Sequence, residues 1–173
     1  MSENRFLSSV LTEGILSIIF GWCILVLPKL TDVSFGFTLC ISFILYGGYK
    51  AIMSFISRNF ERCFVLSIIS SLILFLTGLF VFFAQVIDMT LIAAVLGIYF
   101  ILESIIASGF AMQTETLFKT IRSGLFIAVV RLFFGIVLVV ALPSLWVSGV
   151  LASLNFLLSG IFLINMFLIK KIS

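Results

Sequence analysis

The stretch GILSIIFGWCILVLP, residues 14–28, decides the fold because the chain carries two further versions of it. The counterparts are SLILFLTGLFVFFAQ at residues 71–85 and AVVRLFFGIVLVVALP at residues 128–143. In each version a small residue stands seven positions before a glycine, and a turn residue follows that glycine by seven or eight positions. The three glycines, Gly21, Gly78 and Gly135, are evenly spaced. A period held along the whole chain indicates an internal repeat.

A second register runs through the apolar stretches that follow. Gly47-Gly48, Glu103-Ser104 and Ser159-Gly160 also recur at one constant interval. Each repeat is therefore expected to be a hairpin of two spans. Because each hairpin returns the chain to the same side, three hairpins insert the same way round, which predicts a pseudo-threefold arrangement about the membrane normal. The repeats cover approximately residues 6–57, 63–113 and 123–170.

Composition places the chain in a lipid bilayer. Hydrophobic residues make up 63% of the chain, charged residues make up 10%, and the mean hydropathy is +1.41. Soluble domains have about 45–50% hydrophobic and about 25% charged residues. A spanning helix needs about 20 apolar residues. We therefore expect an all-α integral membrane protein that is a single membrane domain over residues 1–173. The apolar runs predict six spans, at about residues 6–28, 33–56, 64–87, 89–112, 123–142 and 145–169.

The first apolar run is expected to be a span, since it lacks the small-residue cleavage site of a secretory signal. The turns inside the hairpins are short, and Pro28 and Pro143 stand at equivalent turns, where proline can end a helix without breaking its interior. The linkers between repeats, about residues 57–63 and 113–122, are longer and charged.

Basic residues predict the orientation in the membrane. Only Lys29 belongs to the side of the short turns, whereas the other side receives most of the lysines and arginines. By the positive-inside rule, both termini and both linkers are expected to be cytoplasmic. The residues on that side are Arg5, Arg58, Arg62, Lys119, Arg122, Lys170 and Lys171, with Lys50 close to them.

Several classes of chemistry are disfavoured by what the chain lacks. It has no histidine, so the commonest acid/base group and metal ligand is missing. Its cysteines, Cys23, Cys40 and Cys63, have no metal-type spacing and are expected to be inert thiols. The formal charge of +3 comes from scattered basic residues, with no nucleic-acid motif. We expect no enzyme activity, no cofactor, no metal and no nucleic-acid partner.

The triple hairpin resembles the HdeD-like acid-resistance membrane protein family, from about Gly14 to Lys170. The resemblance implies a bacterial inner-membrane protein linked to acid or general stress, and it implies no established reaction. Many second helices of that family carry an Asp-Gly or Glu-Gly pair, whereas this chain keeps an acid only at Glu103. The residues that carry the resemblance are Gly21 with Pro28 and Gly47-Gly48, Gly78 with Glu103-Ser104, and Gly135 with Pro143 and Ser159-Gly160.

Four ionisable residues fall inside the predicted spans: Glu13, Lys50, Glu103 and Arg131. Each is seven to ten residues from the cytoplasmic end of its span, about 10–15 Å deep, so they share one layer that is neutral in total. A lone charge at the centre of a span costs at least about 2.5–3.5 kcal/mol. We expect Glu103 to lie within ion-pair reach of Arg131 or Lys50, with help from Asn155, Ser17 and Ser153.

This layer has three interpretations. In the first, interhelical ion pairs fix how the hairpins dock, with Lys50 and Glu13 reaching toward the interface. In the second, Glu103 is a proton-responsive acid. In the third, the layer binds a lipid or another small ligand. Its residues differ between the three copies, unlike the glycines, so a site is expected here if the protein has one.

The function that fits best is a non-catalytic, stress-related role through packing against partner proteins or lipids. Small residues let helices approach closely, so self-association or a membrane-protein complex is plausible. The helix-packing candidates are Gly21, Gly47, Gly48, Gly78, Gly135 and Gly160. The alternative is a small proton or ion channel or transporter using Glu103 with Lys50 and Arg131. No broken helix, of the kind that forms many transport sites, is evident.

Overall fold

The computed structural model describes residues 3–30, 34–57, 64–84, 89–113, 118–141 and 144–172. Each range is a helix, preceded in two cases by one non-helical residue, and each helix is long and apolar enough to cross a membrane. The all-α class and the six spans predicted from the sequence are confirmed. The helices are α1 (Glu3–Leu30), α2 (Phe35–Ser57), α3 (Phe64–Ala84), α4 (Met89–Gln113), α5 (Phe118–Ala141) and α6 (Leu145–Ile172).

Helix boundaries differ from the predicted ones by a few residues, and two of the differences change where named residues lie. Pro28 lies inside α1, which continues to Leu30; in the last turn a proline costs one backbone hydrogen bond, and its fixed φ still suits a helix. The helix α5 begins at Phe118, so Lys119 and Arg122 are helical and not part of a linker. Several predicted turn and linker residues lie outside the described residues: Arg58, Glu61, Arg62, Cys63, Gln85 and Pro143.

The start of α2 shows how a local signal sets a helix end. The Ser34 side chain accepts a hydrogen bond from the Phe37 amide at 3.2 Å, and the Ser34 carbonyl accepts one from the Thr38 amide at 3.1 Å. This is the pattern of a serine N-cap, which satisfies donors that the first turn leaves unpaired.

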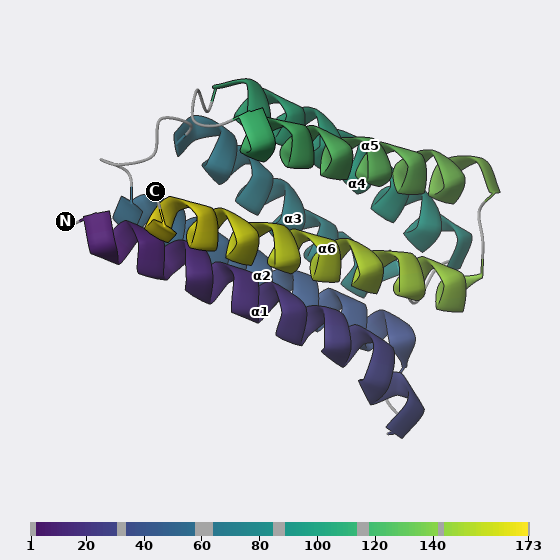
Figure 1. Cartoon of the computed structure of the whole chain (residues 1–173). Coiled ribbons are helices and arrows are strands. Elements are labelled where there is room, and N and C mark those ends of the chain that lie inside the picture. The colour runs from purple at the N-terminus through teal and green to yellow at the C-terminus, as the bar shows by residue number, and fades with distance from the viewer. Residues whose placement is uncertain are drawn as a thin grey trace.

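The six helices run side by side and alternate in direction, with the start of α1 and the end of α6 at the same end of the bundle (Figure 1). We call this end the terminal end. The opposite end, where α1 stops at Leu30 and α2 begins at Phe35, is the turn end. Along α2 and α4 the residue number therefore rises toward the terminal end.

The closest helix packing is not within the predicted hairpins. The most extensive contacts join α2 to α3, α4 to α5, and α6 to α1, whereas hairpin partners such as α1 and α2 touch over a much shorter length. Each even-numbered helix thus packs mainly on the odd-numbered helix across the linker, and α6 packs mainly on α1. Hydropathy predicted which segments span the membrane, but it carried no information about this pairing.

Glycines lie where these pairs approach most closely. A Cβ on Gly21 would be 3.1 Å from the Ser153 carbonyl of α6, one on Gly78 would be 2.9 Å from the Ile44 amide of α2, and one on Gly135 would be 2.9 Å from the Gly97 carbonyl of α4. Backbones this close leave no room for a side chain, as at small-residue interfaces in membranes.

The glycines of the even-numbered helices do not all behave alike. A Cβ on Gly47 would lie 2.8 Å from the Phe75 amide, and one on Gly160 would lie 2.6 Å from the Gly14 carbonyl. Gly48 differs from the expectation, because a Cβ there would meet no described atom within 4 Å. Gly48 and Gly160 occupy the same position in the first and third repeats, but only Gly160 lies at a close helix contact.

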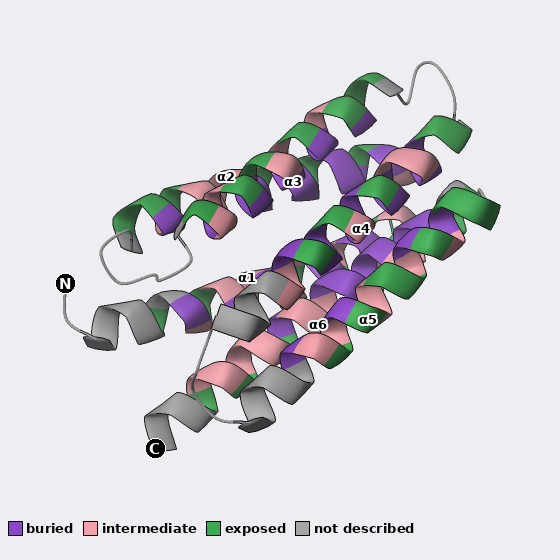
Figure 2. Ribbon diagram, turned by 90° about the horizontal axis from the view of Figure 1, so that it is seen from above, coloured by how far each residue is buried: buried purple, intermediate pink, exposed green. Residues whose placement is uncertain are grey.

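The buried apolar residues of the core lie mainly in the turn-end halves of the helices. In Figure 2 the buried parts of the ribbons lie toward the interior of the bundle and many exposed parts lie on its outside. The centre is aromatic: the Phe43 ring lies 5.4 Å from Tyr99 and 5.2 Å from Phe156, and Tyr46 lies 5.3 Å from Phe156, between ring centroids. Large apolar residues such as Val140 and Phe126 are exposed, as lipid-facing residues are in a bilayer.

Candidate functional site: a buried charge cluster

The structure brings Lys50 of α2, Glu103 of α4 and Arg131 of α5 into direct contact. The Glu103 Oε1 atom lies 3.5 Å from the Lys50 Nζ atom and 3.4 Å from the Arg131 Nη1 atom. One carboxylate oxygen therefore bridges two cations that come from two other helices. The Glu103 side chain is buried, so its charge is stabilised by these partners in place of water. We refer to these three residues with Ser70, Asn155 and Ser159 as the charge cluster.

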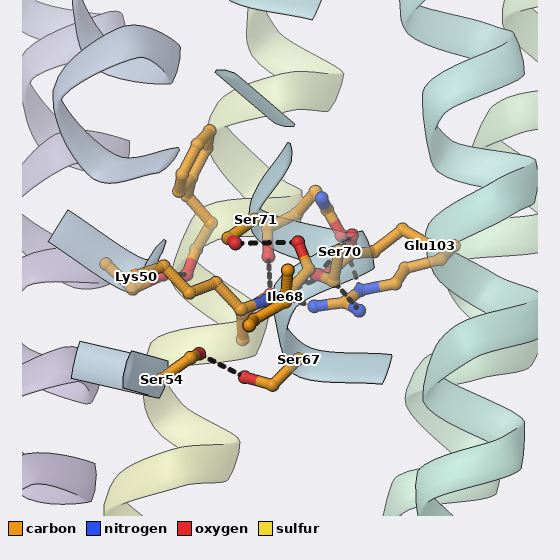
Figure 3. A network of polar contacts seen from close by, with 12 residues as sticks. Lys50, Ser54, Ser67, Ile68, Ser70, Ser71 and Glu103 are labelled. Carbon is orange, nitrogen blue, oxygen red and sulfur yellow. Dashed lines mark hydrogen bonds and ion pairs between the residues drawn. The ribbon is translucent and has the colours of Figure 1, made fainter. Parts of the chain in front are cut away.

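Ser70 of α3 completes the carboxylate's surroundings. Its hydroxyl lies 3.1 Å from both oxygens of Glu103 and accepts a hydrogen bond from the Lys50 ammonium at 2.6 Å (Figure 3). Sequence reasoning missed Ser70 because it is uncharged. The repeat does carry a signal, since Ser70 follows Glu13 by the same interval that separates Gly78 from Gly21, and thus stands at the same place in the second copy.

Arg131 is held from its other side by α6. Its Nε atom donates to Asn155 Oδ1 at 2.9 Å, and its Nη2 atom donates to the Ser159 hydroxyl. The Ser159 hydroxyl in turn donates to the Asn155 carbonyl at 2.6 Å. Asn155 therefore does help to satisfy the buried charges. Through these contacts the charge cluster joins five of the six helices, α2 to α6.

The other predicted helpers act elsewhere. Ser17 donates to the Phe156 carbonyl at 2.7 Å and Ser153 donates to the Gly21 carbonyl at 2.6 Å, so both serines fasten α1 to α6 and do not contact a charge through these bonds. Ser104 makes the same kind of bond to the Ala128 carbonyl at 2.7 Å, between α4 and α5. Small hydroxyl side chains thus serve helix packing as well as charge pairing.

Glu13, the fourth predicted member of the layer, lies on α1 beside α2. It interacts electrostatically with Tyr46 and Tyr49 and is half-buried. Lys50, Glu103 and Arg131 together have one positive charge in excess, and the carboxylate of Glu13 makes the layer neutral. Of the four predicted residues, the structure therefore brings Lys50, Glu103 and Arg131 into contact, while Glu13 interacts with the tyrosines of α2.

The chemistry open to the cluster is limited. Its polar atoms contact one another, and the Ser70 hydroxyl lies 2.6 Å from the Lys50 ammonium and 3.1 Å from both oxygens of Glu103. In the described part of the chain no group of three or more Cys, Asp or Glu side chains is placed to hold a metal ion. The arrangement can hold helices together and can take up a proton at Glu103.

A groove of about 280 Å³ lies between α2 and α3, close to Gly48. Its lining is apolar apart from Ser71, and it opens to the surface beside the exposed side chains of Phe55 and Leu72. The groove occupies the space that Gly48 leaves unfilled. It has no charged lining residue, so it adds no chemistry to the cluster.

A family model matches residues 12–83, which include α1 from residue 12, all of α2, and α3 to residue 83. No curated protein and no solved structure matches the chain. The matched family is described as a short repeat of unknown function. Over residues 12–83 the chain is similar to this repeat family, DUF308, which includes HdeD-like membrane proteins.

Proposed function

We propose that this chain is a non-catalytic, HdeD-like protein of a bacterial inner membrane that supports resistance to acid or general stress by packing against partner proteins or lipids. Within it the charge cluster has a structural role and locks the docking of the helices. The observation that carries the structural role is the position of Glu103, whose carboxylate is held by cations from α2 and α5 and by a hydroxyl from α3.

The proposal includes three hairpin repeats related by a pseudo-threefold axis, with both termini cytoplasmic. Three observations support it. The same pairing of an even-numbered with an odd-numbered helix occurs at α2 and α3, at α4 and α5, and at α6 and α1. Gly78, Gly135 and Gly21 lie at these three interfaces, and the start of α1 and the end of α6 lie at one end of the bundle. The excess of basic residues toward that end supports its cytoplasmic orientation.

A structural role is favoured over conduction by what surrounds the cluster. On the turn side of Glu103 lie Phe43, Tyr99 and Phe100, all buried, and the buried Phe156 ring packs against Phe43. A channel needs a continuous polar path, and these rings interrupt it. The cations and the acid also satisfy one another, which suits an interhelical lock better than a site that must release its ion.

Proton flux into proteoliposomes tests this role against the channel alternative. We expect the wild-type protein to conduct no faster than lipid vesicles without protein, and Glu103→Gln to leave the flux unchanged while lowering the thermal unfolding midpoint. The reason is that the neutral amide removes the anion from between two cations without opening a path. A flux that is present in the wild type and vanishes in Glu103→Gln would instead establish the channel.

The stress role needs a test in cells. In a deletion strain of the source organism, the wild-type gene is expected to restore survival after acid exposure, and Glu103→Gln to restore less of it. A matched control is Ser148→Ala, which removes a buried hydroxyl that bonds locally, to the Ser144 carbonyl. Equal survival with and without the gene, under acid and under other membrane stresses, would contradict the stress role.

A further inference from the structure

On the terminal side of the charge cluster, the interface of α2 and α3 carries a further pair of polar side chains. One helical turn from Lys50 and Ser70, Ser54 of α2 and Ser67 of α3 face each other with their hydroxyl oxygens 2.5 Å apart (Figure 3). Both serines are buried. Because residue numbers rise toward the terminal end along α2 and fall toward it along α3, this pair lies on the terminal side of the cluster. The interface of α2 and α3 thus carries two consecutive polar layers.

The opposite direction is closed by rings. Tyr46 and Phe43 on α2 and Tyr99 and Phe100 on α4 lie on the turn side of the cluster, and none is more than 5% exposed. The ring of Phe156, which stands between Asn155 and Ser159 on α6, packs against Phe43 and Tyr46. Beyond them follow buried aliphatic residues such as Leu39, Ile92 and Leu96. Water and protons that would reach Glu103 from the turn end must pass these packed rings and the aliphatic side chains beyond them.

We infer that Glu103 is a proton-binding site that communicates with the terminal end alone, through the Ser54 and Ser67 pair. The step is a simple protonation: a hydronium ion from the terminal-side solution gives up a proton through water hydrogen-bonded to the two hydroxyls. One O–H bond of the hydronium ion breaks, one O–H bond forms at a carboxylate oxygen, water remains, and the same route returns the proton. No other bond forms or breaks and no further reactant is needed. Because the proposed route does not continue from Glu103 to the turn end, the site responds to the proton concentration on one side of the membrane and passes no proton to the other.

Protonation changes the forces between the helices. Lys50 and Arg131 both contact the same oxygen of Glu103, so a neutral carboxyl leaves two cations facing each other at short range in a medium of low dielectric. Their repulsion acts between α2 and α5. The expected response is a loosening of the charge cluster when the terminal side is acidified.

The groups that face Glu103 from each neighbouring helix are consistent with this response. On α2 they are Lys50 and Tyr46, and on α5 Arg131. On α3 only the hydroxyl of Ser70 contacts the carboxylate among the described contacts. Tyr99 of α4 also interacts with it electrostatically, Asn155 and Ser159 of α6 act through Arg131, and Glu13 of α1 acts through Tyr46.

The inference rests on the structural role proposed for the cluster, and the two can fail separately. If neutralising Glu103 leaves the unfolding midpoint unchanged, the structural role fails. If the proton reaches Glu103 from the turn end, or from both ends equally, one-sided access fails whatever the stability of the variants.

Infrared difference spectroscopy on proteoliposomes of known orientation tests the access directly. The carboxylic-acid C=O band of Glu103 is identified by its absence in Glu103→Gln. We expect the band to appear when the solution on the terminal side is acidified, and to be absent when only the turn side is acidified. A band that appears equally from both sides, or only from the turn side, overturns the inference.

A double variant and a control variant test whether protons reach Glu103 along Ser54 and Ser67. The double variant Ser54→Ala with Ser67→Ala is expected to slow the appearance of the band roughly tenfold, because the hydroxyl layer that hydrogen-bonds the entering water is gone. The control is Ser148→Ala, a buried serine near the turn end, which is expected to leave the rate unchanged. An unchanged rate in the double variant, with the fold intact by circular dichroism, shows that protons do not use this pair.

Discussion

Glu103→Ala is expected to destabilise the folded protein by about 3–5 kcal/mol, because removing the carboxylate leaves two buried cations without their anion. Lys50 and Arg131 lie 3.5 Å and 3.4 Å from Glu103 Oε1 and contact it from different helices. The variant therefore replaces an attraction that joins α2, α4 and α5 by a repulsion between α2 and α5. Denaturant unfolding of the purified protein in lipid micelles, followed by circular dichroism, measures the loss.

Two controls separate the pairing from the mere removal of charge. The triple variant Lys50→Met, Glu103→Leu and Arg131→Met is expected to recover much of the lost stability, since a buried ion pair can be replaced by apolar residues of similar volume. Lys29→Met removes an exposed cation at the turn end, where its Nζ atom lies 5.4 Å from the Trp146 ring centroid, and is expected to have a small effect. A stable Glu103→Ala protein, or a triple variant worse than the single one, would contradict the account.

Gly160→Ala is expected to have the second large effect and to destabilise the protein by about 1–3 kcal/mol through overpacking. The new Cβ would lie 2.6 Å from the Gly14 carbonyl and 2.6 Å from the Ile18 Cγ1 atom. A backbone carbonyl cannot rotate away as a side chain can, so α1 and α6 must separate along a closely packed interface. The same unfolding measurement reports the change.

The matched control stands at the same place in the first repeat. Gly48→Ala adds the same methyl group where no described atom lies within 4 Å, so it is expected to stabilise α2 slightly by removing the conformational freedom of glycine. Opposite signs at Gly48 and Gly160, which are equivalent positions of the first and third repeats, would show that the structure has made the copies unequal. Equal effects of both substitutions would show that the α1 and α6 interface is not as close as described.

The sequence predicted the spans well because the bilayer leaves few alternatives: apolar segments must satisfy their backbone hydrogen bonds internally, and a helix does so. It also indicated the layer that holds Lys50, Glu103 and Arg131, since charges in apolar helices are rare and need partners. The pairing of α2 with α3 and of α6 with α1 could not be read from hydropathy, because lipid-facing and helix-facing surfaces are equally apolar.

The remaining misses have similar causes. Ser70 is not distinguished in the sequence from the other serines of the spans. Its role depends on the packing of α3, which places its hydroxyl beside the Glu103 carboxylate. The sequence suggests buried charges as partners of Ser17 and Ser153, whereas in the structure both hydroxyls donate to backbone carbonyls on the neighbouring helix. Pro28 predicts a helix end, whereas the structure places it inside the last turns of α1. In each case the residue type indicates the kind of interaction, but the residue with which it interacts depends on how the helices pack.

A double-mutant cycle between Glu103→Gln and Arg131→Met tests the central claim most directly, namely that the charge cluster holds the helices together. The unfolding free energies of the wild type, the two single variants and the double variant give the coupling between the two side chains. We predict a favourable coupling of about 1 kcal/mol or more, as for residues in one buried network. Effects that add within about 0.3–0.5 kcal/mol, as for independent sites, would contradict the claim.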